Sequence, residues 1–433
     1  MSPLIVGVIF TIIAFILLFS GMPLGLAFGL TGFVGYAVVY NLNGALGVLR
    51  TVPFTTFADY GLSVIPLFVL MGSLAFAARL SEDLYASARG VFGGLRGGLA
   101  ITTVAACGAF AAISGSAIAT AATMCRVALP EMRRYKYNIG LATGCIASGG
   151  TIGILIPPSI MFILYGIIAE QSIGRLYMAG FIPGIILVIF YIITISVLCW
   201  RNPNMGPPGP KTTLKEKFIS LARGWSALVL FAIVIGGIYA GWFSANEAAG
   251  VGAFCCLLIG LGLRRLTWQG IKEALLDTAR TTAMIFLIMT GALIFNYFLT
   301  ITGVSEAFAN AVTSMNLSKY VVIVFIIIVY LVLGALMDEL AMIFITVPIF
   351  FPLVTGIGWD PIWFGVIVVM ACVAGGIAPP VGMNVFVIHG MAKDVPMFTI
   401  YRGIIPFLVA DAALMFLLVA VPEIALFLPG LMK

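Results

Sequence analysis

Two adjacent carboxylates, Asp338 and Glu339, lie inside an apolar stretch of the chain. Ionisable side chains are costly in such surroundings and are functional candidates by default. Thr151 and Asn384 lie near other interruptions of apolar runs and offer neutral side-chain oxygens. Hard cations prefer oxygen ligands of both kinds. Asp338 is the better candidate for a cation ligand. If one of the two carboxylates faces water at the hairpin mouth instead, we expect it to be Glu339.

A Ser-Gly-Ser segment, Ser114–Ser116, interrupts another apolar run. The serine hydroxyls can bind an ion or a polar substrate, and Gly115 allows a ligand to approach the backbone closely. Thr120 and Thr123 follow at helical spacing, but single threonines in membrane helices usually bond back to their own backbone. We therefore expect a functional role for Ser-Gly-Ser and a structural role for the two threonines.

The interruptions recur with a common offset. The proline pairs Pro157-Pro158 and Pro379-Pro380 are separated along the chain by the same interval as Ser116 and Asp338. A proline pair removes two helix donors and clashes with the preceding turn. Interrupted apolar segments at corresponding places in two halves of a chain indicate the binding site of a membrane transporter.

The composition is that of a polytopic helical membrane protein. The chain is 62% hydrophobic and 9% charged, where soluble domains carry roughly 25% charged residues. Leu4–Phe19 is expected to be a retained span, because no basic stretch precedes it. None of the seven cysteines forms a C-x-x-C motif, and His389 has no nearby ligand-type partner, so we expect neither a metal-binding motif nor a cofactor.

The net charge of +6 does not indicate nucleic-acid binding, because the basic residues are spread over the loops between apolar segments. Basic residues concentrate on the cytoplasmic side of membrane proteins. The windows 79–96 and 126–136 are basic, whereas the windows at the common offset from them, 301–318 and 348–358, contain no lysine or arginine, and Lys319 lies just outside. Equivalent loops are therefore expected on opposite faces of the membrane, which predicts inverted repeats.

The only long polar stretch, 201–224, is rich in proline and lysine and is expected to be a cytoplasmic linker. It separates a first repeat, 1–200, from a second repeat, 225–433. This arrangement places the N-terminus on the periplasmic side. The full spans are expected near 4–20, 22–40, 60–78, 176–200, 225–243, 247–263, 281–299 and 403–421.

Each repeat is also expected to contain a re-entrant hairpin and a proline-broken helix. The hairpins are 97–130 and 320–352, and the broken helices are 138–170 and 361–392. The second arms of the hairpins, Ala117–Leu129 and Glu339–Phe351, have 13 residues each, against roughly 20 needed to cross a bilayer. Half-depth hairpins fit this length better, with tilted short spans as the alternative.

Hairpin tips and helix breaks are suited to binding ions. A helix start has free N–H donors and a partial positive charge, and a helix end has free carbonyls. Two hairpins and two broken spans can therefore surround one site with donors for a carboxylate and acceptors for a cation.

Several segments together resemble the large membrane subunit of tripartite ATP-independent periplasmic (TRAP) transporters. The resemblance runs from about residue 60 to 410 and preserves the order and spacing of the motifs. The matching stretches are Ile65–Gly72, Ala112–Thr123, Gly150–Ser159, Glu170–Gly174, Ala179–Gly184, Ile345–Ile349 and Pro379–Asn384.

The resemblance implies a sodium-coupled, elevator-type importer of organic acids such as C4-dicarboxylates or sialic acid, in the bacterial inner membrane. It also implies a small four-helix membrane subunit and a periplasmic substrate-binding protein as partners. The implied substrate-binding residues are Ser114, Gly115, Ser116, Pro157, Pro158, Pro379, Pro380 and Asn384. The implied sodium ligands are Ser114, Ser116, Thr151, Gly334, Asp338, Gly376 and Ala378.

One residue departs from the family pattern. Ala378 precedes the second proline pair, where the family commonly has threonine, so a side-chain oxygen is lost there. The resemblance therefore leaves the number of sodium ions open.

Two other functions are alternatives. One is a stand-alone inverted-repeat anion carrier, coupled to protons or sodium, with Asp338 or Glu339 as the proton-binding group. The other is a membrane-embedded enzyme, for which the sequence offers no nucleophile–base pair and no metal-binding motif. We therefore expect a transporter and not an enzyme.

Overall fold

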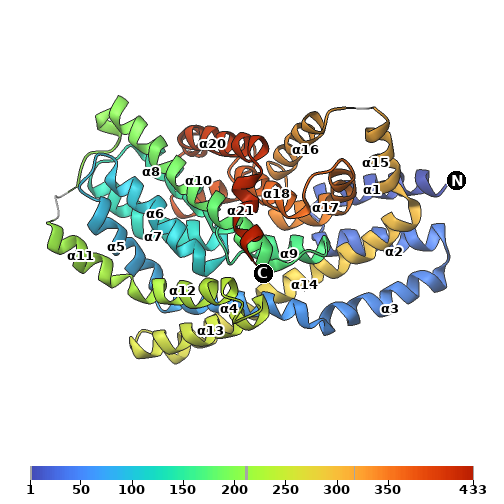
Figure 1. The fold of residues 1–433 in the computed structure, drawn as a ribbon, viewed down its shortest axis with the longest axis horizontal. Coiled ribbons are helices and arrows are strands. Elements are labelled where there is room, and N and C mark those ends of the chain that lie inside the picture. The colour runs from blue at the N-terminus through green and yellow to red at the C-terminus, as the bar shows by residue number, and fades with distance from the viewer. Residues whose placement is uncertain (1, 210–212, 316, 433) are drawn as a thin grey trace.

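The computed structural model describes residues 2–209, 213–315 and 317–432, except for the side chain of Leu214. The described residues form α-helices and short 3₁₀ turns and contain no β-strand (Figure 1). Of the expected linker, Pro210, Lys211 and Thr212 lie outside the described residues.

The first half contains ten helices among the described residues. They are α1 (Pro3–Phe19), α2 (Leu24–Val39), α3 (Leu42–Ala58), α4 (Val64–Ala77), α5 (Leu80–Phe92), α6 (Gly98–Ser114), α7 (Ala117–Arg134), α8 (Ile139–Thr151), α9 (Ile160–Ile168) and α10 (Ile173–Arg201). A 3₁₀ turn, Tyr60–Ser63, leads into α4, and another, Ile152–Ile154, follows α8.

The described part of the linker contains a short helix, α11, that leads into the first span of the second half. The helices are α11 (Leu214–Arg223), α12 (Trp225–Tyr239), α13 (Ala245–Gly262), α14 (Trp268–Thr302), α15 (Val304–Ser314), α16 (Lys319–Gly334), α17 (Glu339–Gly356), α18 (Pro361–Gly375), α19 (Met383–Met391), α20 (Met397–Ala420) and α21 (Glu423–Leu431).

The helices repeat with nearly the same offset as the proline pairs. At this offset, the starts of α1, α2, α6, α7, α8, α9 and α10 correspond in order to those of α12, α13, α16, α17, α18, α19 and α20. The 35-residue helix α14 occupies the place of α3 and α4 together, which are separated in the first half by a break at Asp59. The described chain is therefore a repeat of one helical pattern.

Each repeat contains a hairpin whose tip packs against a broken helix. The first hairpin, α6 and α7, turns at Gly115, which has a φ of 61°. A Cβ atom at Gly115 would lie 2.9 Å from the carbonyl oxygen of Pro158, in the break between α8 and α9. The second hairpin, α16 and α17, meets its own broken helix through a backbone bond from Val381 N–H to the Ala335 carbonyl at 3.2 Å. Both tips therefore end inside the protein, as re-entrant hairpins do.

The expected length of the hairpin arms was wrong. Helices α7 and α17 each have 18 residues, because both continue through prolines, Pro130 in α7 and Pro348 and Pro352 in α17. The arms were expected to end just before Pro130 and Pro352. Neighbouring helices and local adjustments satisfy the backbone groups that a proline frees, so a proline need not end a buried helix. The hairpins are identified by the contact of each tip with a helix break and not by short arms.

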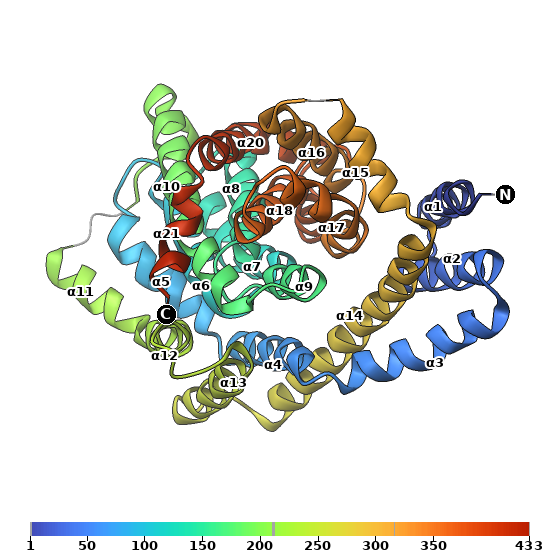
Figure 2. The same ribbon diagram turned by 45° about the vertical axis from the view of Figure 1, so that its right-hand side comes forward.

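The helices form two groups, which we call the frame and the hairpin block. The frame comprises α1–α4 and α12–α14, and the hairpin block comprises α6–α9 and α16–α20. Figure 2 shows α14 running diagonally, with α2 and α3 on its outer side and the hairpin block on the other. Helix α4 packs against α6 and α9, and α14 packs against α17, so the two groups meet along these helices.

Six helical segments in the described residues are long and apolar enough to cross a membrane. They are Tyr60–Ala77, α10, α13, α14, α17 and α20, with α11 and α12 as a further bent pair at 55°. Helices α1, α2, α6, α16 and α18 are apolar but have 10 to 17 residues. The expected span at 281–299 is part of the longer α14. The helices that were not predicted from the sequence are α3, α5, α11, α15 and α21.

Candidate functional site

The first hairpin tip is held by its own serines. Ser116 caps α7, because its hydroxyl accepts a hydrogen bond from the Ala119 N–H at 3.3 Å. The Ser114 and Thr120 hydroxyls lie 2.9 Å apart. The hydroxyls of Thr120 and Thr123 donate to the carbonyls of Ser116 and Ala119, so the expected back-bonding of both threonines is confirmed. The tip therefore presents the positive end of α7 beside two hydroxyls.

The second tip places its two carboxylates differently from the expectation. Asp338 caps α17 and is half-buried, and its side chain accepts a hydrogen bond from the Leu340 N–H at 3.2 Å. Glu339 is 9% exposed, and its Oε1 atom has no hydrogen-bond partner among the described residues. The expectation that Glu339 faces water was wrong, because the first residue after the cap turns into the protein while the cap stays at the helix end.

Four of these residues meet where the two broken helices pass each other. A Cβ atom at Gly376, just after α18, would lie 2.8 Å from Glu339 Oε1 and 3.5 Å from Thr151 Cγ2. A Cβ atom at Gly150 would lie 3.0 Å from the side-chain nitrogen of Asn384. The structure thus brings together the end of α8, the end of α18, the start of α17 and the start of α19.

This meeting point has more acceptors than donors. Asn384 is fully buried and donates its amide to the Ala147 carbonyl at 3.1 Å, and its Oδ1 atom has no partner among the described residues. Thr151 is also fully buried and donates its hydroxyl proton to the Ser148 carbonyl. Glu339 Oε1 and Asn384 Oδ1 are therefore unpaired acceptors within one small region. Buried acceptors without donors are costly, and oxygen atoms of this kind are suited to a hard cation.

The remaining predicted residues lie around this region with unequal burial. Pro157 and Pro158 are buried, whereas Pro379 and Pro380 are exposed. The Tyr401 hydroxyl donates to the carbonyls of Pro380 and Val381 at 2.6 and 2.9 Å. These contacts hold the second break in place from α20.

Gly334 and Ala378 occupy two different surroundings. Gly334 lies in close contact with Gly375, where a Cβ atom would be 2.9 Å from the Gly375 Cα. Ala378 lines an apolar cavity between α16, α18 and α20, together with Asp411. The cavity that Ala378 lines is separate from the cavity beside the first hairpin tip, which Ser114 lines.

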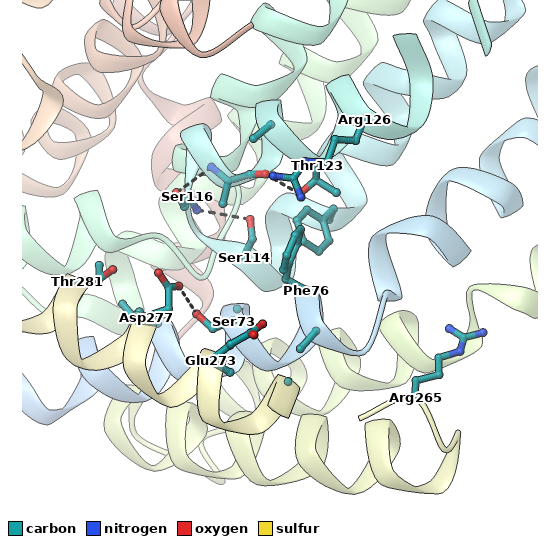
Figure 3. Close-up of a pocket in the computed structure, with 18 of the residues that line it drawn as sticks. Ser73, Phe76, Ser114, Ser116, Thr123, Arg126, Arg265, Glu273, Asp277 and Thr281 are labelled. Atoms are coloured by element: carbon teal, nitrogen blue, oxygen red, sulfur yellow. Dashed lines mark hydrogen bonds between the residues drawn. The ribbon is translucent and has the colours of Figure 1, made fainter. Parts of the chain in front are cut away.

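A cavity of about 470 Å³ opens beside the first hairpin tip, between the frame and the hairpin block. Its lining runs from Ser114 and Ser116 along α7 to Arg126, and across to α4 and α14 (Figure 3). The Ser73 hydroxyl donates to Asp277 at 2.8 Å, joining α4 to α14. Arg265, in the loop before α14, pairs with Asp83, and this hydrogen-bonded partner raises the pKa of the guanidinium. The volume suits a small organic ligand.

Two charged residues near these sites were missed from the sequence. Arg126 lines the cavity on the same helix as the first tip. Asp411 is 1% exposed in the middle of α20, and its Oδ1 atom accepts a hydrogen bond from the Tyr191 hydroxyl at 2.6 Å. A lone aspartate in the span expected at 403–421 was the available signal, because a carboxylate inside a membrane segment is a functional candidate by default.

Comparisons with known proteins agree with this architecture. The family described as "Tripartite ATP-independent periplasmic transporter, DctM component" matches residues 11–424. A C4-dicarboxylate TRAP transporter large permease protein of Pseudomonas aeruginosa is 34% identical over 401 residues, covering 90% of this chain and 93% of its own. A sialic acid TRAP transporter large permease protein of Vibrio cholerae is 31% identical, covering 96% of each chain.

A solved structure supports the fold independently. The YdaH transporter of Alcanivorax borkumensis, described as having an unusual topology, superposes with a TM-score of 0.62 at 15% sequence identity. The match covers 87% of this chain and 88% of that transporter. At this identity the likeness concerns the fold alone. Because the family match spans almost the whole chain and the relatives align over most of their length, the chain belongs to the DctM component family of tripartite ATP-independent periplasmic transporters.

Proposed function

We propose that the chain is the translocation subunit of a sodium-coupled importer of organic acids. The observation that carries this proposal is the pair of unpaired buried acceptors, Glu339 Oε1 and Asn384 Oδ1, at the meeting point of the two broken helices. A cation bound there gains ligands that are otherwise costly to bury. Sodium is the hard monovalent cation available in quantity outside a bacterial cell, and its gradient can drive uptake.

The substrate position is proposed at the tip of the first hairpin. The first turn of α7 provides backbone donors and a partial positive charge, which suit a carboxylate. Ser114 and Ser116 add hydroxyls, Gly115 keeps the backbone accessible, and Asn384 lies against the adjacent Gly150. The two proline pairs keep the neighbouring backbone out of helical geometry, so that its polar groups can face the substrate.

The sodium ligands are proposed on both repeats. Carbonyls at the ends of α8 and α18 suit a cation, since helix ends carry a partial negative charge. Ser114, Ser116 and Thr151 supply ligands from the first repeat, and Gly334, Asp338, Gly376 and the backbone of Ala378 supply them from the second. We add Glu339 to the proposed set, because its unpaired oxygen lies close to Gly376.

The substrates that the descriptions of two relatives name are carboxylates. One relative is described as a C4-dicarboxylate transporter subunit and another as a sialic acid transporter subunit. Both ligands are small organic anions, which fit a cavity of about 470 Å³. We propose a substrate of this class for the present chain, delivered by a periplasmic binding protein, with a small four-helix membrane subunit as the second membrane partner.

Transport is proposed to occur by an elevator movement of the hairpin block along the frame. The two groups meet mainly at α4 and α14, and the cavity that reaches the first tip lies between them. In this proposal, residues 1–200 and 225–433 are the two repeats, 201–224 is cytoplasmic, and the N-terminus is periplasmic in the bacterial inner membrane. The distribution of basic residues supports this orientation.

Uptake into proteoliposomes tests the proposal. The vesicles contain the chain with its small subunit, the cognate binding protein is added outside, and the probes are radiolabelled succinate and N-acetylneuraminate. We expect uptake of at least one probe with an inward sodium gradient, and none with potassium in place of sodium. Uptake without the binding protein would favour a stand-alone carrier, and uptake driven by a proton gradient alone would contradict sodium coupling.

A further inference from the structure

The cavity beside the first hairpin tip has four charged side chains in its lining: Arg126, Arg265, Glu273 and Asp277. Three of them have polar partners. Arg265 pairs with Asp83, the Gln269 amide donates to Glu273 at 2.8 Å, and the Ser73 hydroxyl donates to Asp277 at 2.8 Å. The three charged side chains on the frame side of the cavity therefore each have a hydrogen-bond or ion-pair partner.

Arg126 is the exception. Among the described residues, no carboxylate lies within ion-pair distance of its guanidinium. Its contact is with the face of the Phe76 ring, 6.0 Å from the centroid. Figure 3 shows Arg126 and Thr123 on α7 next to Phe76, with Glu273 and Asp277 on the facing helix. This cation is thus exposed to the cavity without an anionic partner.

The position of Arg126 on α7 relates it to the hairpin tip. Residues 116, 119, 123 and 126 all line the cavity, and spacings of three and four residues place them on one face of the helix. Ten residues of helix separate Ser116 from Arg126, which is roughly 15 Å. The tip and the guanidinium are therefore two positions on one continuous wall.

We propose that Arg126 is a second binding position for the carboxylate of the transported anion, on the path between the hairpin tip and the mouth of the cavity. The inference rests on the proposed function. A guanidinium binds a carboxylate in a bidentate manner, and the ring of Phe76 limits its freedom by stacking. Glu273 and Asp277 repel an anion from the α14 wall, which directs it to the α7 wall.

The test replaces the charge and then restores it chemically. In Arg126→Cys, a thiol-reactive ethylammonium methanethiosulfonate restores a positive charge, and the ethylsulfonate analogue adds a negative one. Six of the seven native cysteines are buried, and unsubstituted protein treated identically controls for Cys255. Arg134→Cys is the matched control, because Arg134 lies two turns further along α7 and does not line this cavity.

The readout is the KM and kcat for sodium-driven uptake of the better of the two probes, succinate or N-acetylneuraminate. We expect Arg126→Cys to raise KM about tenfold, the size expected for losing one charged hydrogen-bonding group. The ammonium reagent should restore part of this loss, and the sulfonate reagent should increase it. Arg126→Lys should fall between wild type and Arg126→Cys, because an ammonium group keeps the charge but lacks the bidentate geometry. Arg134→Cys should behave like wild type with either reagent.

Four results would overturn the inference. An unchanged KM in Arg126→Cys, or a defect that the ammonium reagent does not relieve, would show that the charge binds no substrate. If the double variant Glu273→Gln, Asp277→Asn showed the same increase in KM, Arg126 would instead act through a charged contact with these two residues across the cavity. If wild-type protein transports neither probe, the proposed function fails, and this inference fails with it.

Discussion

Glu339 and Asp338 are neighbours in sequence with opposite surroundings. The Asp338 carboxylate already accepts a hydrogen bond from the first turn of α17, whereas Glu339 Oε1 has no partner in the described part of the chain. A carboxylate whose hydrogen bonds are satisfied gains less from a cation than one that is buried and unpaired. At the residue scale, the structure therefore favours Glu339 over Asp338 as the anionic sodium ligand.

Glu339→Gln should weaken sodium binding more than Asp338→Asn does. The first change removes the unpaired charge, whereas asparagine can still cap α17 in place of Asp338. We expect the sodium concentration for half-maximal uptake to rise at least tenfold in Glu339→Gln, equivalent to about 1.4 kcal/mol. The measurement is the sodium dependence of initial uptake rates in proteoliposomes. A larger effect at Asp338 would support the original assignment from the sequence.

At the element scale, the helical repeat was predictable because its signals are local. The proline pairs and the cap positions Ser116 and Asp338 recur at the same offset, and the structure places helix breaks and helix starts there. The lengths of α7 and α17 were not predictable, since a proline ends or continues a helix according to the neighbours that satisfy the freed carbonyls. Those neighbours come from distant parts of the chain.

The meeting of Thr151, Gly376, Asn384 and Glu339 could be predicted only in part. From the sequence, Thr151 and Asn384 were predicted as polar residues at helix breaks, and Gly376 was implied by the family resemblance. Glu339 was the carboxylate expected to face water. Which of two adjacent residues faces inward at a helix start depends on the helix phase and on what packs against it, and neither can be read from a single sequence. The role of Arg126 was also hidden, because its distance from the tip matters only once a cavity connects them.

One buried contact between elements lies beside the proposed sites, next to Ala378 and Thr151. Tyr191 on α10 and Asp411 on α20 form a buried hydrogen bond that joins the last long helices of the two repeats. Tyr191→Phe removes the donor and leaves a buried carboxyl group without it. We expect a loss of about 2 kcal/mol in the free energy of unfolding.

Thermal unfolding of the purified protein in detergent measures this loss as a lower melting temperature. Tyr239→Phe on α12 is the control, because its side chain is 47% exposed. Equal melting temperatures of Tyr191→Phe and wild type would show that the contact does not stabilise the helix pair.

At the scale of the whole molecule, the frame and the hairpin block are each packed through glycines. In the frame, α2 and α14 approach so closely that a Cβ atom at Gly25 would lie 2.5 Å from the Leu287 carbonyl oxygen. In the hairpin block, a Cβ atom at Gly403 of α20 would likewise clash with the Gly140 carbonyl oxygen of α8. Such contacts leave little room for sliding within either group. Movement is therefore expected between the groups, where the cavity lies.

Gly72 on α4 lies at the boundary between the frame and the first hairpin tip. A Cβ atom there would be 3.0 Å from the Ser114 carbonyl oxygen, so Gly72→Val should destabilise the state in which the tip lies beside α4. Overpacking typically costs about 1–3 kcal/mol, and a bias of that size between two states should reduce kcat for uptake roughly tenfold or more.

Gly236→Val on α12 is the control, because nothing lies within 4 Å of its added Cβ. If both variants transport at the wild-type rate, the tip does not lie against α4 at a stage that limits transport. If Gly72→Val instead lowers the melting temperature without changing kcat, the contact is a fixed packing contact and the hairpin block does not move past the frame there.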